Sequence, residues 1–409
     1  MGDLKDISKW IAHQGPPVSV RRLERLLYGG GTGIESAAVH DVRVFYVDVQ
    51  KGWERGALRS DNLGSVLMAD LELPNDVPIF QAPMAGGPST PELTAAVASA
   101  GGFGFLAAGY LSPAQLREQI SALRELSGAP FGINVFCPSA PADQGTVARF
   151  ARLIQPESDR LGVALGEPLW DDDAFNDKLE IATSEHVNLV SFTFGCPGSE
   201  IVDDLHSAAC RIAVTVTSHH EALLAQAAGA DLLLVQGTEA GGHQGSFFDL
   251  SPNVSPLLQL LEEIRETVHL PMVGSGGIMT GAEGTDVLQK GAFGIQLGTA
   301  FLCCPEAGTS ATYRDALLRK AYPDTVITRA FSGRYARGLA NQFALKYGEL
   351  APDAYPEIHH LTRPLRVAAT AAGDASTPNF WAGQGWQSVS SLSARTIVRQ
   401  MAKELSPAS

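Results

Sequence analysis

A unit made of a short apolar segment and a following small-residue helix repeats eight times between residues 78 and 298, and no other feature constrains the fold as strongly. Near-continuous apolar strands that alternate with helices are typical of a parallel sheet covered on both faces. Eight such units close a (β/α)8 barrel. The expected strands are 78–82, 103–107, 132–136, 189–194, 211–216, 231–235, 270–274 and 294–298, with helices among others at 90–100, 112–126, 218–228 and 280–290.

Three regions lie outside this repeat and suggest the domain organisation. Residues 1–76 lack its regularity, and we expect them to form an N-terminal extension of uncertain fold ahead of a barrel over 77–310. The segment 138–186 interrupts the third unit, and 311–409 carries helical patterns after the eighth. Long connections in a compact fold are usually functional covers. We therefore predict that 138–186 and 311–409 form a mostly helical cap over the mouth of the barrel.

Composition and charge exclude several classes of protein. With 45% hydrophobic residues the chain can bury a large core, and its formal charge of −14 would repel the phosphates of a nucleic acid. No apolar run approaches the roughly 18 residues that span a bilayer, and the start lacks the apolar core of a secretion signal. The five cysteines are scattered without CxxC pairs, which argues against disulfides and zinc. We expect a cytoplasmic protein without metal, membrane or nucleic-acid partners.

The stretch 235–246 follows a buried strand and contains four glycines, one carboxylate and one imidazole, that of His243. Glycine has no Cβ, so a ligand can approach the backbone of this loop closely. A histidine with a pKa of about 6.5 can take a proton near neutral pH, which suits abstraction from a moderately acidic C–H group. His243 is therefore the catalytic candidate, the alternative being a structural histidine. Glu239 either orients His243 or caps a neighbouring helix.

Two glycine-rich loops close the seventh and eighth strands. Gly276 and Gly277 follow the seventh strand, and 296–299 ends the eighth. In barrels that bind phosphorylated ligands, the loops at these two places supply backbone N–H groups and a short helix start. We predict a phosphate site here, tight packing of strand against helix being the alternative.

The ends of other strands indicate a site for a flat ring. The bend at Ala82, Pro83 and Met84 is fixed by proline and could lie against such a ring, although a lone methionine is more often a core residue. Asn134 and Gln236 place amides at the ends of apolar strands. A buried amide must be hydrogen-bonded. The heteroatoms of isoalloxazine would serve, and a satisfied core amide is an equally ordinary outcome.

Eight short segments, each weak alone, match one family as a set: 81–87, 101–104 with 107–110, 134–136, 190–197, 235–243, 276–277, 296–299, and 331–334 with 336–339. From about Pro78 to its C-terminus the chain resembles the nitronate monooxygenases, formerly called 2-nitropropane dioxygenases. The resemblance implies an FMN-binding TIM barrel that oxidises alkyl nitronates with O₂ to a carbonyl compound and nitrite without NAD(P)H.

The resemblance also implies roles for individual residues. His243 would be the catalytic histidine, acting on a small nitronate or nitroalkane. The residues that would hold FMN are Ala82, Pro83, Met84, Asn134, Gln236, Gly241, Gly276, Gly277, Gln296, Leu297, Gly298 and Thr299.

This chain departs from the family pattern at three places. Members usually begin a few residues before the Gln81 segment, and Met68 stands where such a start would lie, so either the start is placed too early or an extra segment has been acquired. Tyr335 stands where proline is common, and Gln342 where arginine is common. Both positions fall in the predicted cap, which leaves the range of substrates open.

Three rival functions are compatible with the same barrel. A flavin-dependent enoyl-acyl-carrier-protein reductase shares the barrel and FMN but takes hydride from NAD(P)H, and the 190–197 segment and the 138–186 insertion favour the monooxygenase over it. An NAD(P)H:quinone reductase and a flavin-binding protein without turnover are the others, although His243 argues against the last. The sequence leaves the physiological substrate and the oligomeric state open.

Overall fold

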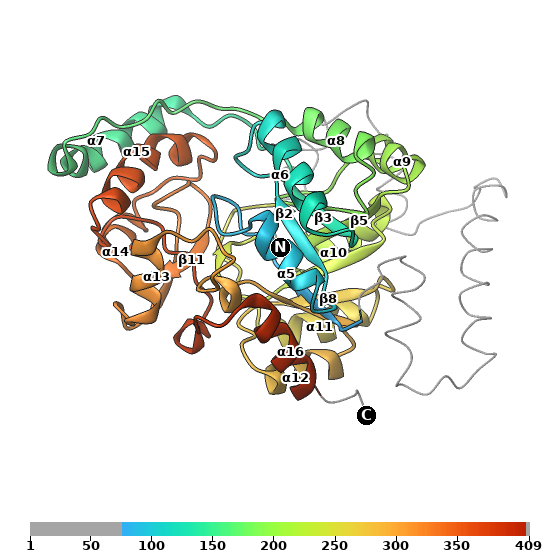
Figure 1. The fold of residues 1–409 in the computed structure, drawn as a ribbon. Coiled ribbons are helices and arrows are strands. Elements are labelled where there is room, and N and C mark those ends of the chain that lie inside the picture. Colours follow the sequence, from blue (N-terminus) through green and yellow to red (C-terminus); the bar gives the residue numbers. More distant parts are fainter. Residues whose placement is uncertain (1–75, 406–409) are drawn as a thin grey trace, which may run out of the picture. The chain divides into compact units, whose positions relative to one another are not determined.

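A computed structural model describes residues 76–405 of the chain, in which the parallel strands form a closed barrel (Figure 1). The predicted extension 1–76 and Met68 lie outside the described residues, apart from Asp76. The eight-stranded sheet has the order β1-β9-β8-β6-β5-β4-β3-β2. Its strands are β1 (Ile79–Gln81), β2 (Gly104–Ala107), β3 (Phe131–Phe136), β4 (Leu189–Thr193), β5 (Arg211–Val216), β6 (Leu232–Gln236), β8 (Met272–Ser275) and β9 (Gly294–Leu297).

The two ends of this sheet meet through a parallel bridge between β1 and β2. Phe103 pairs with Phe80, its N–H donates to the carbonyl of Ile79 at 2.9 Å, and its own carbonyl accepts from the N–H of Gln81 at 2.8 Å. The barrel is therefore closed, and all eight expected strands are present. The predicted (β/α)8 fold is confirmed.

Helices surround the barrel, and the four whose ranges were predicted are confirmed. Each of these four begins after a serine or threonine whose hydroxyl accepts a backbone N–H of the first turn, which is a signal already visible in the sequence. The helices that pack on the barrel are α5 (Pro91–Ala98), α6 (Pro113–Leu126), α8 (Phe175–Ser184), α9 (Ser199–Ser207), α10 (His219–Ala228), α11 (Leu257–Arg265), α12 (Gly281–Gln289) and α16 (Ala394–Glu404).

Both faces of the strands are buried, which explains their near-continuous apolar sequence. Along β5, Ile212 and Val214 pack in the layer between sheet and helices, whereas Ala213 packs with Phe80 and Phe105 inside the barrel. Mostly large apolar side chains fill this interior. Burial on both faces is what a parallel sheet requires, and it leaves only the strand ends for chemistry.

The two stretches predicted as cap divide between cap and barrel. From 138–186, α7 (Gln144–Leu161) packs on α15 (Glu357–Ala371), whereas α8 packs on β3 and α6. From 311–409, α16 packs on α12 and α5 rather than with the other C-terminal helices. Both α8 and α16 carry an apolar face that the barrel buries. The cap comprises α7, α13 (Ala311–Leu318), β10 (Thr325–Thr328), β11 (Ala336–Leu339), α14 (Gln342–Tyr347) and α15.

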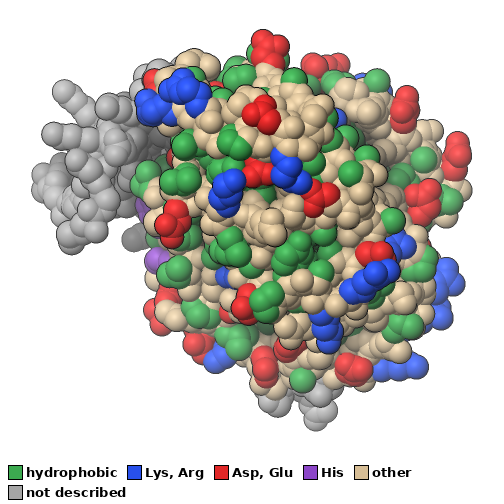
Figure 2. All heavy atoms as spheres, turned by 90° about the vertical axis from the view of Figure 1, so that its left-hand side faces the viewer, with side chains coloured by type: hydrophobic (Ala, Val, Ile, Leu, Met, Phe, Trp, Pro, Cys, Tyr) green, Lys and Arg blue, Asp and Glu red, His purple; other side chains and the backbone are tan. Residues whose placement is uncertain are grey.

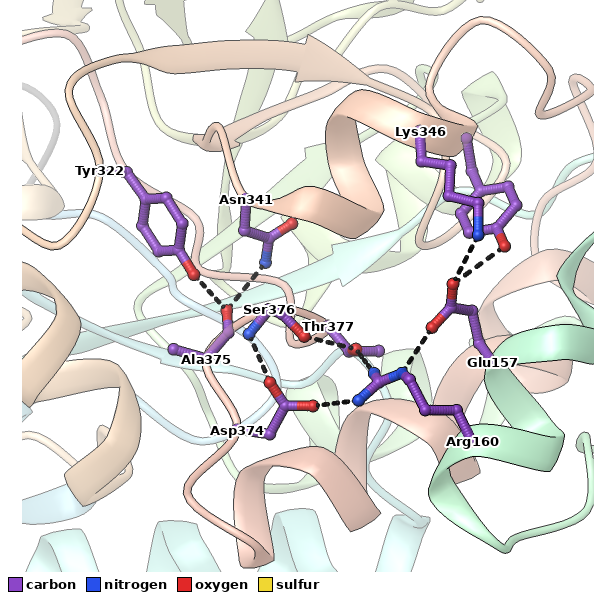
Figure 3. Close-up of polar contacts among 10 residues, drawn as sticks. Glu157, Arg160, Tyr322, Asn341, Lys346, Asp374, Ala375, Ser376 and Thr377 are labelled. Atoms are coloured by element: carbon purple, nitrogen blue, oxygen red, sulfur yellow. Dashed lines mark hydrogen bonds and ion pairs between the residues drawn. The ribbon is translucent and has the colours of Figure 1, made fainter.

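A polar network ties α7 to the C-terminal part of the cap (Figure 3). Arg160 donates to Glu157 at 2.9 Å, to Asp374 at 2.8 Å and to the Thr377 hydroxyl at 2.6 Å. Glu157 in turn accepts from the Tyr347 hydroxyl at 3.0 Å. Other members of the network are Tyr322, Asn341, Lys346, Ala375 and Ser376. Arg160 therefore joins segments more than two hundred residues apart in the chain.

Replacing Arg160 by alanine is expected to lower the free energy of unfolding by about 1 kcal/mol, because two partly exposed ion pairs of up to about 1 kcal/mol each are lost together. Denaturant unfolding of the purified protein measures this change. Arg319→Ala is the matched control, since Arg319 pairs only with Asp315 one helical turn away and both side chains are mostly exposed, at 79% and 61%. Equal losses in the two variants would show that the network adds nothing to a single surface pair.

The face of the molecule that carries α7, α14 and α15 shows acidic and basic side chains interspersed with apolar ones (Figure 2). Exposed apolar residues of these helices include Leu345 and Val367. A surface of mixed charge does not create a field of one sign. This face therefore gives a charged partner no broad patch to bind, and the polar groups that bear on function lie inside the barrel mouth.

Candidate functional site

One cavity of about 920 Å³ lies at the carboxyl ends of the strands and is covered by the cap. It is lined by His243 and by eleven of the twelve residues expected to hold a cofactor, namely Ala82, Pro83, Met84, Asn134, Gln236, Gly241, Gly276, Gly277, Gln296, Gly298 and Thr299. The exception is Leu297, whose side chain packs in the core and whose carbonyl accepts the N–H of Ala82 at 2.8 Å. Because the candidates were chosen at the carboxyl ends of the strands, almost all of them line the same cavity.

The bend at the end of β1 is held by a glutamine that the sequence analysis gave no role. Gln81 is fully buried; its Oε1 accepts from the N–H of Phe105 at 3.1 Å, and its Nε2 donates to the carbonyl of Ala82 and to the Ser89 hydroxyl, both at 2.8 Å. The same hydroxyl accepts the N–H of Met84 at 2.8 Å. In the sequence, the sign of this role was a polar glutamine inside an otherwise apolar strand. Its amide fixes the backbone that faces the cavity.

The glycines of the site let backbone segments approach one another more closely than other residues allow. Gly276 and Gly277 have φ of +138° and +69°, a region that favours glycine. A Cβ on Gly277 would lie 2.9 Å from the Cβ of Glu239, and one on Gly241 would lie 2.4 Å from the backbone nitrogen of Gly383. The loops after β6 and β8 and the segment around Gly383 therefore form one wall of bare backbone beside the cavity.

Two side-chain amides at strand ends differ in the hydrogen-bond partners of their nitrogen atoms. Asn134 donates through Nδ2 to the hydroxyls of Ser191 at 2.9 Å and Thr193 at 3.0 Å, so this nitrogen is bound within the barrel. Gln296 also lines the cavity, and its Nε2 is buried with no hydrogen-bond partner in the structure. A buried donor without a partner is costly, and a ligand acceptor would relieve that cost. Gln296 is therefore the clearest ligand-directed polar group of the site.

The backbone of His243 is fixed on two sides. Gly242 and His243 form β7 (Gly242–His243), which pairs with β11 so that His243 lies opposite Ala336. Gln236 connects this strand to the barrel: its Nε2 donates to the carbonyl of His243 at 3.1 Å, and its Oε1 accepts the N–H of Gly245 at 2.8 Å. The amide of Gln236 therefore positions the loop that carries His243. Both of its polar atoms find hydrogen-bond partners within the protein, which is one of the two alternatives that the sequence left open.

The imidazole of His243 stands among aromatic rings and forms one polar contact with the cap. Its Nε2 lies 2.7 Å from the hydroxyl oxygen of Ser332. Ring centroids of Trp381, Phe194 and Tyr355 lie 5.3, 5.6 and 6.0 Å from its own. These rings surround the half-buried imidazole, which also lines the cavity.

Burial and two nearby cations keep the imidazole neutral. Loss of solvation, followed by the guanidinium groups of Arg334 and Arg366, lowers the pKa of His243 to about 3. Arg334 lies with its guanidinium carbon 4.2 Å from the ring centre of Phe194 and donates to the carbonyl of Ser246. The neutral ring has a free lone pair, as a general base requires, but the lowered pKa also makes it a weaker base than an ordinary histidine.

Arg366 also has only neutral hydrogen-bond partners. It donates to the Thr362 hydroxyl at 3.2 Å, to Oδ1 of Asn379 at 3.0 Å and to the carbonyl of His359 at 2.9 Å. Loss of solvation lowers the pKa of its guanidinium to about 10, so it remains charged at neutral pH. The Arg366 guanidinium is thus a cation on the cavity wall with no carboxylate among these partners, and Asp171, Asp172 and Asp173 line the same cavity.

Tyr110, three residues after β2, and the cap residues Tyr355 and Ser332 also line the cavity. Tyr110 stacks on His359 with ring centroids 4.1 Å apart and an interplanar angle of 6°. The hydroxyl of Tyr355 donates to that of Tyr110 at 3.4 Å. Ser332 falls within a family-matching segment but carried no assigned role. Tyr110 follows a strand end, whereas Tyr355 and Ser332 reach the site from loops far along the chain, which neither periodicity nor strand ends could indicate.

Glu239 caps a helix rather than contacting the imidazole. Its carboxylate accepts the N–H of Leu257, the first residue of α11, at 3.1 and 3.3 Å. A carboxylate at a helix N-terminus is favourable because it meets unpaired N–H groups and the positive end of the helix dipole. The helix-capping alternative for Glu239 is therefore confirmed.

The cysteines and acidic residues form no further reactive centre among residues 76–405. All five thiols are free, and burial raises the pKa of Cys196 to about 12, which disfavours the reactive thiolate. No group of three or more His, Cys, Asp or Glu side chains in this part of the chain could hold a metal ion. Searched over the same residues, the helices include none long and apolar enough to cross a membrane.

A closed (β/α)8 barrel with a histidine and glycine-rich strand ends around a capped cavity defines the class of TIM-barrel enzymes. Comparison with known proteins narrows this class. A profile of the nitronate monooxygenase family matches residues 70–404. A probable nitronate monooxygenase of Staphylococcus saprophyticus is 35% identical over 337 residues, which cover 80% of this chain and 94% of that relative. The chain belongs to the nitronate monooxygenase family.

Solved structures agree with this assignment. A nitroalkane oxidase from Streptomyces ansochromogenes is 44% identical, with a TM-score of 0.80 over 83% of this chain and 98% of its own. FabK from Thermotoga maritima is 26% identical, with a TM-score of 0.65 over 82% of this chain and 94% of its own. The resemblance stated from the sequence is thus confirmed at the level of family and enzyme class.

Proposed function

We propose that this chain uses FMN to oxidise alkyl nitronates with O₂ to a carbonyl compound and nitrite, and that His243 is the base that first deprotonates neutral nitroalkanes. The observation that carries the proposal is the placement of a neutral imidazole on the cavity wall, with its backbone fixed by β11 and Gln236. Family membership supports the reaction class.

The residues present fit FMN. The partnerless Nε2 of Gln296 suits an acceptor on the ring, and the fixed bend from Ala82 to Met84 offers a flat wall for it. The glycine loop after β8 and the start of η2 (Thr299–Phe301) would hold the phosphate, as loops at these places do in other barrels. When bound, FMN accepts electrons from the nitronate and passes them to O₂.

The chain itself would bind the substrate, move one proton and exclude water. The guanidinium groups of Arg334 and Arg366, which act on His243, would attract an anionic nitronate to the part of the cavity beside the imidazole. His243 takes the proton from the carbon next to the nitro group, and the electron pair remains on the substrate as the nitronate. Phe194, Tyr355 and Trp381 keep bulk water from this transfer.

The proposal is tested by assays of the purified protein. Flavin released by heat and identified by chromatography should be FMN, and addition of a nitronate such as propionate 3-nitronate should produce nitrite together with uptake of O₂. Release of FAD would contradict the cofactor assignment. A flavin-loaded protein that gives no nitrite from any small nitronate would contradict the reaction.

We expect the activity on neutral nitroalkanes to show no loss around pH 6.5. With a pKa of about 3, His243 stays neutral at pH 5 to 8, whereas an ordinary histidine would be half protonated near 6.5. A profile of kcat/KM from pH 5 to 8 measures this. A limb with a midpoint near 6.5 that disappears in a His243 variant would show that the imidazole titrates normally.

The lowered pKa of His243 also makes the free energy of unfolding depend on pH. Below pH 6.5 the unfolded chain protonates this histidine while the folded chain does not, so the unfolded state binds more protons and the folded state loses stability as pH falls from 6.5 towards 3. Replacing His243 by glutamine, which cannot titrate, should make the free energy of unfolding fall less steeply between pH 6.5 and 5. An unchanged slope would contradict the lowered pKa.

A further inference from the structure

We infer that His359 is a substrate-binding histidine of this site: its neutral imidazole carries its proton on Nε2 and donates that N–H to a nitro oxygen of the substrate, on which charge collects when His243 removes the proton from carbon. This inference rests on the proposed function. It gives the cavity a specific hydrogen-bond donor for the group that nitroalkanes and nitronates share.

The hydrogen-bond partner of Nδ1 fixes the tautomer of His359. Nη2 of Arg366 lies 3.4 Å from Nδ1 and also donates to the carbonyl oxygen of His359 at 2.9 Å. A guanidinium group has N–H donors and no acceptor, so Nδ1 must accept this hydrogen bond. A neutral imidazole whose Nδ1 accepts carries its proton on Nε2. The direction of the bond therefore follows from the chemistry of arginine and does not depend on its length.

The imidazole of His359 stays neutral because its surroundings disfavour a second proton. Loss of solvation, followed by the guanidinium of Arg366, holds the pKa of His359 well below its usual range. A proton on Nδ1 would also point at the N–H groups of Arg366. His359 therefore offers one N–H donor and no free lone pair, which suits the binding of an acceptor rather than the removal of a proton.

The ring is held in place while its Nε2 remains accessible. His359 is 8% exposed, lines the cavity, and stacks on Tyr110 with ring centroids 4.1 Å apart. This stacking and the two hydrogen bonds from Arg366 restrict rotation of the ring. Within residues 76–405 no group forms a hydrogen bond with Nε2, and this nitrogen is not enclosed by protein. A ligand in the cavity can therefore supply the acceptor that this donor lacks.

Such a donor meets a need that the weak base creates. With its pKa lowered to about 3, His243 can take a proton from carbon only if the nitronate that forms is stabilised. The negative charge of a nitronate lies mostly on its two oxygens, so a fixed N–H aimed at one of them stabilises the transition state more than the neutral substrate. Both histidines line the same cavity, and the charge of His243 acts on the pKa of His359, which places the two rings within electrostatic reach.

The proton balance of this step involves His243 alone. The carbon proton goes to His243, the electron pair of the C–H bond moves into the bond between carbon and nitrogen, and the charge moves onto the nitro oxygens. His359 keeps its proton throughout and only donates a hydrogen bond.

Two substitutions separate the donor from the ring that carries it. His359→Phe keeps a flat ring against Tyr110 without a donor, whereas His359→Gln keeps an N–H donor. We expect His359→Phe to lower kcat on a neutral nitroalkane about 10²- to 10³-fold and to raise KM for a preformed nitronate about 10-fold or more, at unchanged flavin content. His359→Gln should stay within about 10-fold of the natural kcat. Natural rates in His359→Phe, or equal losses in the two variants, would overturn the inference.

Nitrogen NMR of the flavin-loaded protein, labelled with ¹⁵N-histidine, provides a readout that needs no turnover. The signals of His359 are identified by their loss in His359→Gln. The probe is 2-methyl-2-nitropropane, which has a nitro group but no hydrogen on the adjacent carbon and so cannot be deprotonated. We expect a neutral ring protonated on Nε2, whose Nε2 signal shifts when the probe is added. A ring protonated on Nδ1, or an Nε2 signal that saturating probe leaves unchanged, would overturn the inference.

The tests also separate this inference from the proposed function. If the flavin-loaded protein gives no nitrite from any small nitronate, the proposed function fails, and the NMR measurement still decides whether His359 donates to a nitro group. If nitronates are oxidised and His359→Phe loses nothing, the function stands and the role of His359 fails. The two histidines also differ in their expected effects, because His243→Ala should mainly affect neutral nitroalkanes, whereas His359→Phe should affect both substrates.

Discussion

Replacing His243 by alanine is expected to lower kcat/KM on a neutral nitroalkane such as nitroethane by about 10²- to 10⁴-fold while the protein keeps its flavin. Most of the residues expected to hold FMN lie on other loops, and Gln236 bonds to the backbone of His243 rather than to its imidazole, so cofactor content should be unchanged. Only the proton transfer from carbon is lost. Steady-state rates of nitrite release, normalised to bound flavin, measure the effect.

A substrate that needs no deprotonation provides the internal control. On a preformed nitronate the same variant should keep much more of its activity, because the step served by the base has already taken place. His220→Ala is the matched control protein, since His220 is exposed on α10 and lies outside the cavity lining. If His243→Ala loses both activities equally, the histidine is not simply a base.

The second large effect is expected from Gly241→Ala, which should abolish stable flavin binding and lower the free energy of unfolding by about 1–3 kcal/mol or more. A Cβ at this position would lie 2.4 Å from the nitrogen of Gly383 and 2.5 Å from the carbonyl carbon of Ala382. Both are backbone atoms, so the methyl group cannot be accommodated by turning a side chain. The loop between β6 and β7 must move instead, and with it the wall of the cavity.

Flavin absorbance per mole of protein and denaturant unfolding measure the two consequences. Gly128→Ala is the matched control, because Gly128 has an ordinary φ and no atom lies within 4 Å of its added Cβ. The control should bind flavin normally. Normal flavin content and stability in Gly241→Ala would show that the close backbone approach at Gly241 is not required by the site.

The barrel and much of the site could be predicted because both follow local rules. The strands are buried on both faces, so β6 appears as a continuous apolar segment, and its end locates Gln236 and the loop that leads to His243. Leu297 shows the limit of this rule. The strand end at Gln296 and Gly298 lines the cavity, but the alternation of side chains turns Leu297 into the core.

The cap could not be predicted in the same way. An apolar helical face indicates burial but not the partner, and α8 and α16 pack on the barrel although their sequence neighbours join the cap. Ser332 reaches His243 from 89 residues away, through a loop without a regular pattern. Contacts of this kind depend on how the cap closes, which no local pattern determines. The polar partner of the proposed base was therefore visible only in three dimensions.

The central claim is that this barrel takes electrons from a nitronate rather than from a nicotinamide, and the rival enoyl reductase and quinone reductase functions differ from it on this point. The most direct test mixes the purified flavin-loaded protein, without oxygen, with propionate 3-nitronate in one sample and with NADPH or NADH in another, and follows the flavin absorbance. We predict bleaching by the nitronate and no change with either nicotinamide. Bleaching by NADPH or NADH with none by the nitronate would contradict the proposed function and place the chain among the reductases of the same barrel class.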